Sequence, residues 1–300
     1  MNNRVHYTHC PVCASTHINP LLTIKDHSIT GENFVVWQCM DCTLRFTQDV
    51  PDATSIAPYY KSPDYISHTN TKEGLINKLY LRVRTFTLQQ KAKTIQHFTK
   101  LKKGKLLDIG AGAGAFLQQM QKEGWEVTGV EPDEDARKVA NHSFHLNLQD
   151  PSVLEQLPDD SFDAITMWHV LEHIHDLQNQ MAHLKRLVKP NGRLFIAVPN
   201  YQSLDAHIYR LNWAGYDVPR HLYHFSPKAM HTLMQRYHLK IVAQKPMWFD
   251  SFYVSLLSSK YKNGRSINWL GAFISGLRSN INTMMNKDRC SSIIYIISKA

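Results

Sequence analysis

The densest run of residues able to do chemistry lies between Leu106 and Phe116 and reads LLDIGAGAGAF. An apolar strand leads into glycines at positions 110, 112 and 114 and then directly into a helix-forming segment. Glycine lets a backbone turn sharply and lets a ligand approach within van der Waals contact. The helix that follows offers unpaired N–H groups to the same ligand. The sequence therefore predicts a ligand-binding loop at this turn.

An acidic residue follows at the spacing expected for sugar recognition. Glu131 stands 17 residues beyond Gly114, at the end of the second predicted strand, where a carboxylate can accept hydrogen bonds from both ribose hydroxyls of an adenosine. The first two glycines with Ala115 also satisfy a dinucleotide fingerprint, which leaves a nicotinamide oxidoreductase as an alternative. Asp108 argues against a pyrophosphate, because its carboxylate suits a zwitterionic ligand with an ammonium and a sulfonium group.

The run WHVLEHIHD, from Trp168 to Asp176, carries groups for proton transfer or metal binding. His169, Glu172 and His173 occupy positions i, i+3 and i+4, so they share one face if the segment is helical. We predict His169 as a candidate general base. A His/Glu network that only orders the loop is the alternative.

A second histidine-rich run, DVPRHLYHFS, spans Asp217 to Ser226. Arg220 is a candidate anchor for a carboxylate or phosphate of the acceptor, and His221 is a second candidate base for an attacking hydroxyl. We favour a functional role for this run on the acceptor side. The alternative is structural: Pro227 follows Ser226 as it would at the start of a helix, and His224 would then only brace that turn.

Four of the five cysteines form two CxxC pairs, Cys10 with Cys13 and Cys39 with Cys42. This spacing predicts a tetrahedral, structural Zn²⁺ site of the ribbon type, with all four ligands from the protein. A redox CxxC is the alternative, although such a pair would precede a helix. Cys290 is expected to be an ordinary buried thiol.

The block DIGAGAG, Glu131 and the run SFDAITMWHVLEHIHD together resemble class I S-adenosylmethionine (SAM)-dependent methyltransferases, from about residue 75 to the C-terminus. The resemblance implies that Asp108 and the glycines line the methionine and ribose, that Glu131 holds the ribose hydroxyls, and that the loop 147–155 covers the adenine. The implied cofactor site comprises Asp108, Gly110, Ala111, Gly112, Gly114, Glu131, Pro132, Trp168 and His169.

The histidine-rich runs carry a narrower resemblance. WHVLEHIHD is similar to a stretch of ubiquinone-biosynthesis-type O-methyltransferases in which acidic residues and a histidine can hold a divalent metal; here His169 replaces the first acid. Whether His169, Glu172 and His173 bind a catalytic metal stays open. DVPRHLYHFS is similar to a stretch on the acceptor side of related methyltransferases.

The elements that must position these residues alternate between strands and helices. We expect a helix over 76–100 and strands over 105–109, 125–130, 144–148, 162–167, 193–198, 239–244 and 292–298. Between and after them we expect helices over 113–122, 133–141, 176–188, 226–237 and 252–262. Such alternation predicts an α/β, Rossmann-like, doubly wound and mostly parallel seven-stranded sheet. The resemblance makes its last strand antiparallel. We predict a zinc-ribbon-like module with a linker over 1–65 and a methyltransferase domain over 66–300. An aromatic-rich insert around 201–225 would cap the substrate.

Composition and charge narrow the function further. With 43% hydrophobic and 20% charged residues, the 300-residue chain is neither disordered nor fibrous. No apolar run is long enough for a membrane span, and without an export signal we expect a cytoplasmic protein. Residues 76–104 hold eight Lys or Arg and no acid, and residues 201–300 hold 13 against four, which favours an anionic acceptor.

The resulting hypothesis is an enzyme that methylates a small or carrier-linked anionic acceptor: a sugar, a polysaccharide precursor or a quinone-type hydroxyl. A zinc ribbon also precedes the fold in RNA methyltransferases, so an rRNA or tRNA modifier is an alternative, although the ribbon segment carries few basic residues for tracking phosphates. A non-catalytic SAM-binding scaffold is the third possibility. The oligomeric state is left open.

Overall fold

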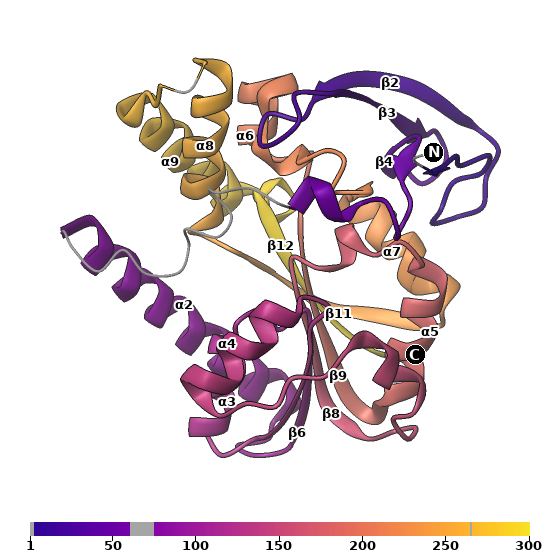
Figure 1. Ribbon diagram of the computed structural model, residues 1–300, viewed down its shortest axis with the longest axis vertical. Helices are drawn as coiled ribbons and strands as arrows, with labels where there is room; N and C mark the ends of the chain where they lie inside the picture. Colours follow the sequence, from indigo (N-terminus) through magenta and orange to yellow (C-terminus); the bar gives the residue numbers. More distant parts are fainter. Residues whose placement is uncertain (1–2, 61–74, 265) are drawn as a thin grey trace. The chain divides into compact units, whose positions relative to one another are not determined.

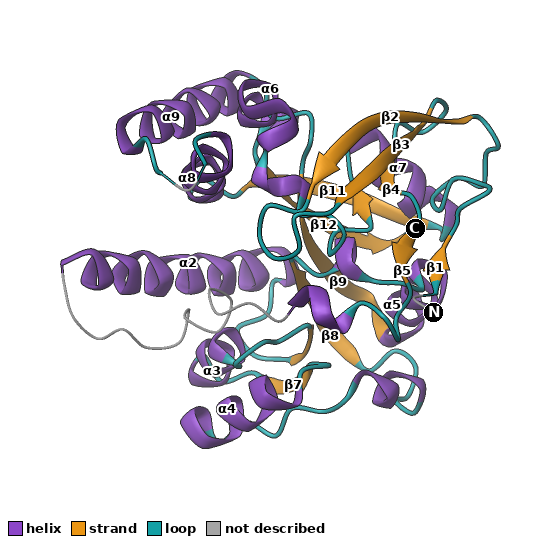
Figure 2. Cartoon of the chain, turned by 45° about the horizontal axis from the view of Figure 1, so that its top comes forward, coloured by secondary structure: helices purple, strands orange, loops and turns teal. Residues whose placement is uncertain are grey.

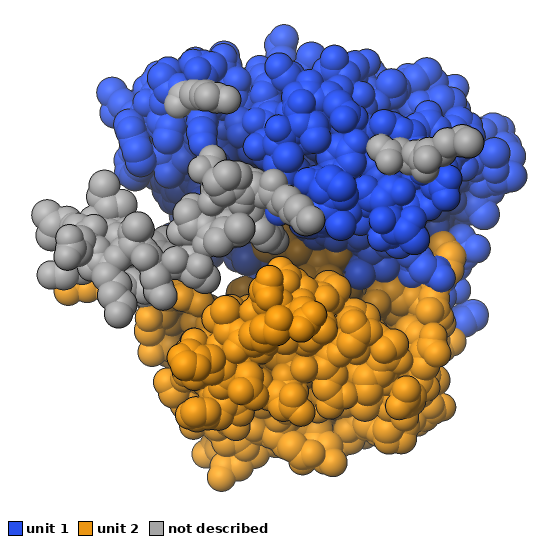
Figure 3. All heavy atoms as spheres, viewed as in Figure 1, with its two compact units in different colours: residues 1–65, 171–177, 197–295 blue, residues 66–170, 178–196, 296–300 orange. Residues whose placement is uncertain are grey.

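The computed structural model describes residues 3–60, 75–264 and 266–300. The chain divides into two compact units (Figure 3). Unit 1 comprises residues 1–65, 171–177 and 197–295, and unit 2 comprises residues 66–170, 178–196 and 296–300.

Six strands form the main sheet, in the order β11-β12-β9-β8-β6-β7. They are β6 (Lys105–Ile109), β7 (Glu126–Val130), β8 (Phe162–Trp168), β9 (Val188–Pro199), β11 (Leu239–Pro246) and β12 (Ser292–Lys299). Strand β6 pairs in parallel with β7 on one side and β8 on the other. Residues 106–109 of β6 are all buried, as expected for a parallel strand covered on both faces.

One helix, α2, precedes the strands of unit 2, and three more follow β6, β7 and β8 in the predicted alternation (Figure 1). They are α2 (Leu75–Thr99), α3 (Ala115–Lys122), α4 (Glu134–Phe144) and α5 (Leu177–Leu187). Asp133 caps α4 by accepting from the backbone N–H groups of Asp135 and Ala136. The predicted α/β, mostly parallel Rossmann-like sheet is therefore confirmed.

Three expectations about these elements need correction. The predicted strand over 144–148 does not form; only an isolated parallel bridge joins Val130 to Gln149, so the sheet has six strands rather than seven. Strand β9 begins at Val188 rather than at the expected residue 193. A helix over 269–285, described below, was not predicted.

Unit 1 contains a four-stranded sheet in the order β10-β4-β3-β2, near the N-terminus in Figure 1. Its strands are β2 (Ile18–Lys25), β3 (Asn33–Cys39), β4 (Arg45–Thr47) and β10 (Tyr223–His224), and a second small sheet pairs β1 (Arg4–Val5) with β5 (Val50–Pro51). The antiparallel pairing of β10 with β4 joins residues almost 180 positions apart in the sequence. The N-terminal strands are thus continued by a strand from the last third of the chain.

The remaining helices of unit 1 lie in its C-terminal portion. They are α6 (Leu204–Tyr209), α7 (Pro227–Arg236), α8 (Asp250–Lys262) and α9 (Trp269–Met285). Helices α6, α8 and α9 pack side by side (Figures 1 and 2). Ser226 caps α7, as predicted, by accepting from the N–H of Ala229. Short 3₁₀ turns cover Ala57–Tyr60, Pro151–Glu155, Leu171–His173, Arg210–Asn212, Ala214–Tyr216 and Lys287–Arg289.

The aromatic residues of the segment expected to cap the substrate lie in the core of unit 1. Tyr201, Tyr209, Trp213 and Tyr216 are buried in one cluster with residues of the N-terminal strands such as Phe34. Trp213 also donates its indole N–H to Asp205 at 2.8 Å. These rings therefore stabilise the fold rather than present open aromatic surface.

Among the described residues, no helix is both long and apolar enough to cross a membrane.

Candidate functional site

The glycine loop of unit 2 folds over the end of strand β7. The backbone N–H groups of Gly110 and Ala111 both donate to the carbonyl of Val130, at 2.8 and 3.0 Å. A Cβ added to Gly110 would lie 2.3 Å from a methyl group of Val170, so this glycine is required for packing. A Cβ added to Gly112, where φ is +53°, would meet nothing within 4 Å. Gly112 thus borders open space that a ligand can enter.

Glu131 is held against this loop by two backbone hydrogen bonds. Its Oε2 accepts from the N–H of Gly112 at 2.7 Å, and its Oε1 accepts from the N–H of Asp133 at 3.0 Å. Burial raises the pKa of this carboxyl, and the two backbone donors partly offset that rise. Each oxygen keeps a lone pair for a further donor. The glycine loop and Glu131, which the sequence analysis placed after two successive strands, are therefore in direct contact.

Asp108 lies at the end of strand β6 and is only 2% exposed. Thr166 of strand β8 donates to its Oδ1 at 2.5 Å. Burial raises the pKa of Asp108 to about 7, although the hydrogen bond from Thr166 and the charge of Lys91 act in the opposite direction. The carboxyl therefore changes charge near neutral pH.

Lys91 of helix α2 is a site residue that the sequence analysis missed. Its Nζ lies 4.2 Å from the centroid of the Trp168 ring, a cation–π distance. Trp168 in turn meets Phe116 edge-on, with the centroids 5.4 Å apart. The sequence analysis predicted a basic helix that contains Lys91, but no local pattern distinguishes this lysine from the other basic residues of the helix.

The segment after strand β8 is not an α-helix. His169 has a left-handed backbone (φ +58°), and only a short 3₁₀ turn covers Leu171–His173. The expectation that His169, Glu172 and His173 share an α-helical face is therefore wrong, because the backbone reverses its handedness at His169.

Unit 1 gathers a different set of ligand-type side chains: Glu172, His173 and His221. One donor atom from each lies within 4.8 Å of the others, and Glu172 is fully buried. The Nδ1 of His173 lies 3.0 Å from the carbonyl of Arg220, and the Nδ1 of His221 lies 2.9 Å from the carbonyl of Gly215. Because a carbonyl only accepts, these Nδ1 atoms carry protons, and an unprotonated Nε2 on the same ring has a lone pair that can bind a metal ion.

This arrangement fits a divalent cation. Two imidazole nitrogens and one carboxylate suit transition metals such as Zn²⁺, Fe²⁺ or Mn²⁺, and the carbonyls behind the rings fix their orientation. Burial, with a smaller effect from the charge of His221, lowers the pKa of His173 to about 4, which keeps that ring neutral at pH 7. The third member of the set is His221, rather than His169.

Arg220 is engaged by protein groups. It donates to both oxygens of Asp217, at 2.6 and 2.9 Å, to Asp26 at 3.3 Å and to the carbonyl of Tyr59 at 2.8 Å. Burial alone would raise the pKa of Asp217, but the hydrogen bond and the charge of Arg220 leave it lowered. This geometry favours a positioning role for Arg220 over the predicted one as acceptor anchor.

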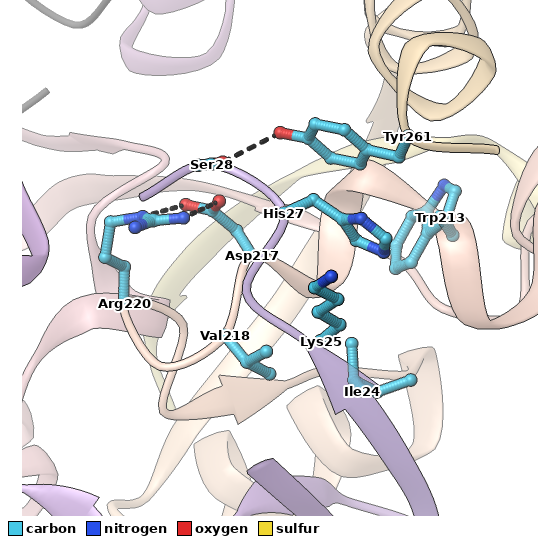
Figure 4. A pocket seen from close by; sticks show the side chains of 9 residues that line it. All are labelled: Ile24, Lys25, His27, Ser28, Trp213, Asp217, Val218, Arg220 and Tyr261. Atoms are coloured by element: carbon cyan, nitrogen blue, oxygen red, sulfur yellow. Dashed lines mark hydrogen bonds and ion pairs between the residues drawn. The ribbon is translucent and has the colours of Figure 1, made fainter. Parts of the chain in front are cut away.

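A pocket of mixed polar and apolar lining lies beside this ion pair, within unit 1 (Figure 4). Besides Asp217 it is lined by Lys25, His27, Ser28 and Tyr261. Ser28 hydrogen-bonds to the hydroxyl of Tyr261 at 2.9 Å, and the ring of His27 stacks on that of Tyr261. His224 is buried, and its Nε2 lies 3.1 Å from the hydroxyl of Thr47.

The four cysteines of the two CxxC pairs meet at one point of unit 1. Their sulfur atoms all lie within 4.8 Å of one another, with Cys10 3.5 Å from Cys42 and Cys13 3.5 Å from Cys39. All four are free thiols, and each pair sits in a tight turn closed by a backbone hydrogen bond. The shared hydrogen bond with Cys42 lowers the pKa of Cys10 to about 5. The donor set fits the predicted Zn²⁺. Cys290 is buried elsewhere, as predicted.

Comparison with known proteins agrees with this architecture. A family model described as a methyltransferase domain matches residues 82–244. The chain is 32% identical over 172 residues to a ubiquinone biosynthesis O-methyltransferase from Coxiella burnetii, covering 55% of this chain and 69% of the relative. Relatives of the same description from other strains of that species are 33% identical, and the match spans 61% of their length.

Among solved structures, the PH0226 protein from Pyrococcus horikoshii OT3 superposes with a TM-score of 0.51 at 15% identity. The match covers 80% of this chain and 100% of that chain, and it supports the fold. The chain therefore belongs to the methyltransferase-domain family. Within that family it is a class I SAM-dependent methyltransferase.

The raised pKa of Asp108 predicts that the folded protein loses stability as this carboxyl ionises. In the folded state Asp108 keeps its proton up to a pKa of about 7, whereas the ordinary pKa of an Asp is 3.8. The bound proton therefore stabilises the fold fully below pH 3.8, and this stabilisation is lost as the pH rises through 7. At pH 8 we expect Asp108→Asn to raise the free energy of unfolding by about 1–3 kcal/mol, with a smaller effect at pH 5. Urea unfolding at both pH values measures this difference, and a variant less stable than wild type at both would contradict it.

The cysteine cluster predicts one Zn²⁺ per chain, measured by elemental analysis of protein purified without added metal. Cys39→Ser should lose it, because three thiolates leave the tetrahedral site open. Cys290→Ala removes the cysteine outside the cluster and should keep the full metal content. Equal zinc in both variants would show that the cluster does not hold the metal.

Proposed function

We propose that the protein transfers the methyl group of SAM to a hydroxyl of a small or carrier-linked anionic acceptor, and that a quinone-type phenol is the first acceptor class to test. The O-methyltransferase relatives support a hydroxyl as the methylated group. The 13 Lys or Arg residues against four acids in residues 201–300 support an anionic acceptor. Five free cysteines fit a reducing compartment such as the cytoplasm.

The observation that carries the proposal is the hydrogen bond between the N–H of Gly112 and Glu131 beside open space. It sets a carboxylate with free lone pairs next to a backbone that a ligand can approach, as ribose binding requires. The buried carboxyl of Asp108 is suited to an ammonium group once it ionises. Lys91, beside Trp168, adds a cation suited to the carboxylate of the cofactor's methionine portion.

The sulfonium of SAM already activates the methyl group, so the protein mainly has to align the acceptor and exclude water. A hydroxyl acceptor must also lose its proton. A divalent cation bound by Glu172, His173 and His221 would lower the pKa of a hydroxyl that coordinates it. Without a cation, the Nε2 of His221 is the atom available to accept the proton. We propose the cation-binding role, because one carboxylate and two oriented imidazoles form a complete facial set.

Glu131→Gln tests the cofactor site. The amide offers one acceptor oxygen in place of two, and its NH₂ group opposes one of the backbone donors, so SAM binding should weaken by about 1.5–3 kcal/mol, on the order of 10- to 100-fold in Kd. Calorimetry with SAM and S-adenosylhomocysteine measures this change. Glu134→Gln, an exposed carboxylate in the first turn of α4, is the matched control and should bind as wild type. Equal affinities in the two variants would remove the basis of the proposal.

Chelation tests the metal. Transfer of labelled methyl to a catechol-type acceptor should fall at least tenfold with a chelator that leaves the cysteine-bound Zn²⁺ in place, and should return with Mn²⁺ or Fe²⁺. His221→Ala should lose both the activity and the rescue, whereas His231→Ala, on the neighbouring helix α7, should keep them. Full activity in chelator together with loss in His221→Ala would identify His221 as a general base instead.

A further inference from the structure

Helix α9 turns its large apolar side chains away from the protein. We call these residues the outer face of α9: Trp269, Leu270, Phe273, Ile274, Leu277, Ile281, Met284 and Met285. Their exposed fractions run from 44% to 78%. Because they recur at intervals of three or four residues, they form one continuous side of the helix.

The opposite side of α9 carries small residues and faces the protein. Ala272, Ser275, Gly276, Ser279 and Thr283 are buried there. They pack on α8, which contributes its own small buried residues Ser251, Ser255, Ser258 and Ser259.

Specific contacts fix this orientation. Ser279 donates to Asp205 at 2.7 Å, and a Cβ added to Gly276 would come within 2.7 Å of the Phe252 ring. Helix α9 therefore cannot rotate to bury its large side chains against α8. This distribution is the reverse of that of a surface helix in water, and small-residue contacts are the mode by which helices pack in lipid.

Basic residues accompany the outer face. Between residues 250 and 289 the sequence holds six Lys or Arg against two Asp. Lys262 and Lys287 are exposed near the two ends of α9, and Arg278 is exposed on the helix itself. An anionic lipid surface attracts such a set. A second copy of the chain carries the same positive charge, so a symmetric interface would bring like charges together.

Exposed aromatic residues at the start of α8 add to the apolar surface of α9. Trp248, Phe249 and Tyr253 are 40–50% exposed, and the carbonyl of Trp248 accepts a hydrogen bond from Asn280 of α9 at 2.8 Å. Tryptophan and tyrosine are enriched where a bilayer meets water. Since no helix of the described residues can cross a membrane, this surface would lie on a bilayer rather than span it.

We propose that the outer face of α9, with the exposed aromatic residues at the start of α8, docks the protein on an anionic lipid bilayer. The helix lies in the headgroup plane, its apolar side chains enter the acyl boundary, and Lys262, Arg278 and Lys287 contact lipid phosphates. The inference is independent of the acceptor, of the cysteine-bound metal and of the histidine cluster.

Co-sedimentation of the full-length protein with vesicles tests the proposal. At 0.1 M salt, most of the protein should pellet with vesicles of 70% phosphatidylcholine and 30% phosphatidylglycerol, and at least tenfold less with phosphatidylcholine alone. Binding to the anionic vesicles should shift tryptophan fluorescence to shorter wavelength. Protein that stays in the supernatant with both vesicle types overturns the proposal.

Two sets of substitutions separate the apolar and the charged contributions. Leu270→Ser with Leu277→Ser and Met284→Ser should reduce anionic-vesicle binding at least tenfold. The matched triple Leu21→Ser, Val35→Ser and Val139→Ser removes exposed apolar side chains elsewhere and should bind as wild type. Lys262→Gln with Arg278→Gln and Lys287→Gln should weaken binding and flatten its dependence on salt.

Since all these side chains are exposed, the variants should keep the thermal unfolding midpoint and the SAM affinity of wild type, which verifies that they fold. Vesicle binding that survives the serine triple on α9 overturns the proposal. So does a concentration-dependent dimer in sedimentation velocity that the same triple dissolves, because the outer face would then meet a second copy.

Discussion

The hydrogen bond from the N–H of Gly112 to Glu131 is the constraint on which the candidate cofactor site depends. It ties the loop that follows β6 to the residue that ends β7, its parallel neighbour in the sheet. This hydrogen bond holds together the loop backbone and the carboxylate that we propose as the two parts of the cofactor site. A Cβ added to Gly112 would meet nothing within 4 Å, so open space lies beside this hydrogen bond.

The sequence predicted those parts of the fold that depend on local chemistry. The glycine loop, the parallel alternation and the cap at Ser226 follow from residues close to one another in the chain. Helix α9 was not predicted, although its large apolar residues recur at the three- and four-residue spacing of a helix. That spacing also does not reveal that small residues such as Ser275 and Ser279, rather than the large ones, face the core. In place of the expected strand over 144–148, a single parallel bridge joins Gln149 to Val130. Strand propensity alone does not decide whether such a segment pairs with its neighbour.

The candidate site beyond the glycine loop depends on contacts between distant residues. His221 joins Glu172 from almost fifty positions away, so spacing within one run could only suggest the nearer His169. Lys91 reaches the Trp168 ring from a helix that precedes the sheet. Arg220 was predicted to anchor an anion of the acceptor, but in the structure it pairs with the protein's own Asp217 and Asp26, which composition does not reveal.

The contact between Asp26 and Arg220 joins the cysteine-bearing segment to the last third of the chain. Asp26 follows strand β2 in the cysteine-bearing segment, is 1% exposed, and meets a guanidinium from the last third of the chain. Removing that segment would leave the buried Arg220 without the charge of Asp26, and losing one partner of a buried ion pair typically costs about 3–5 kcal/mol. It would also expose the aromatic core that the two parts share. The cysteine-rich part therefore shares its core with the last third of the chain, and transferring it to another methyltransferase would require its C-terminal partner as well.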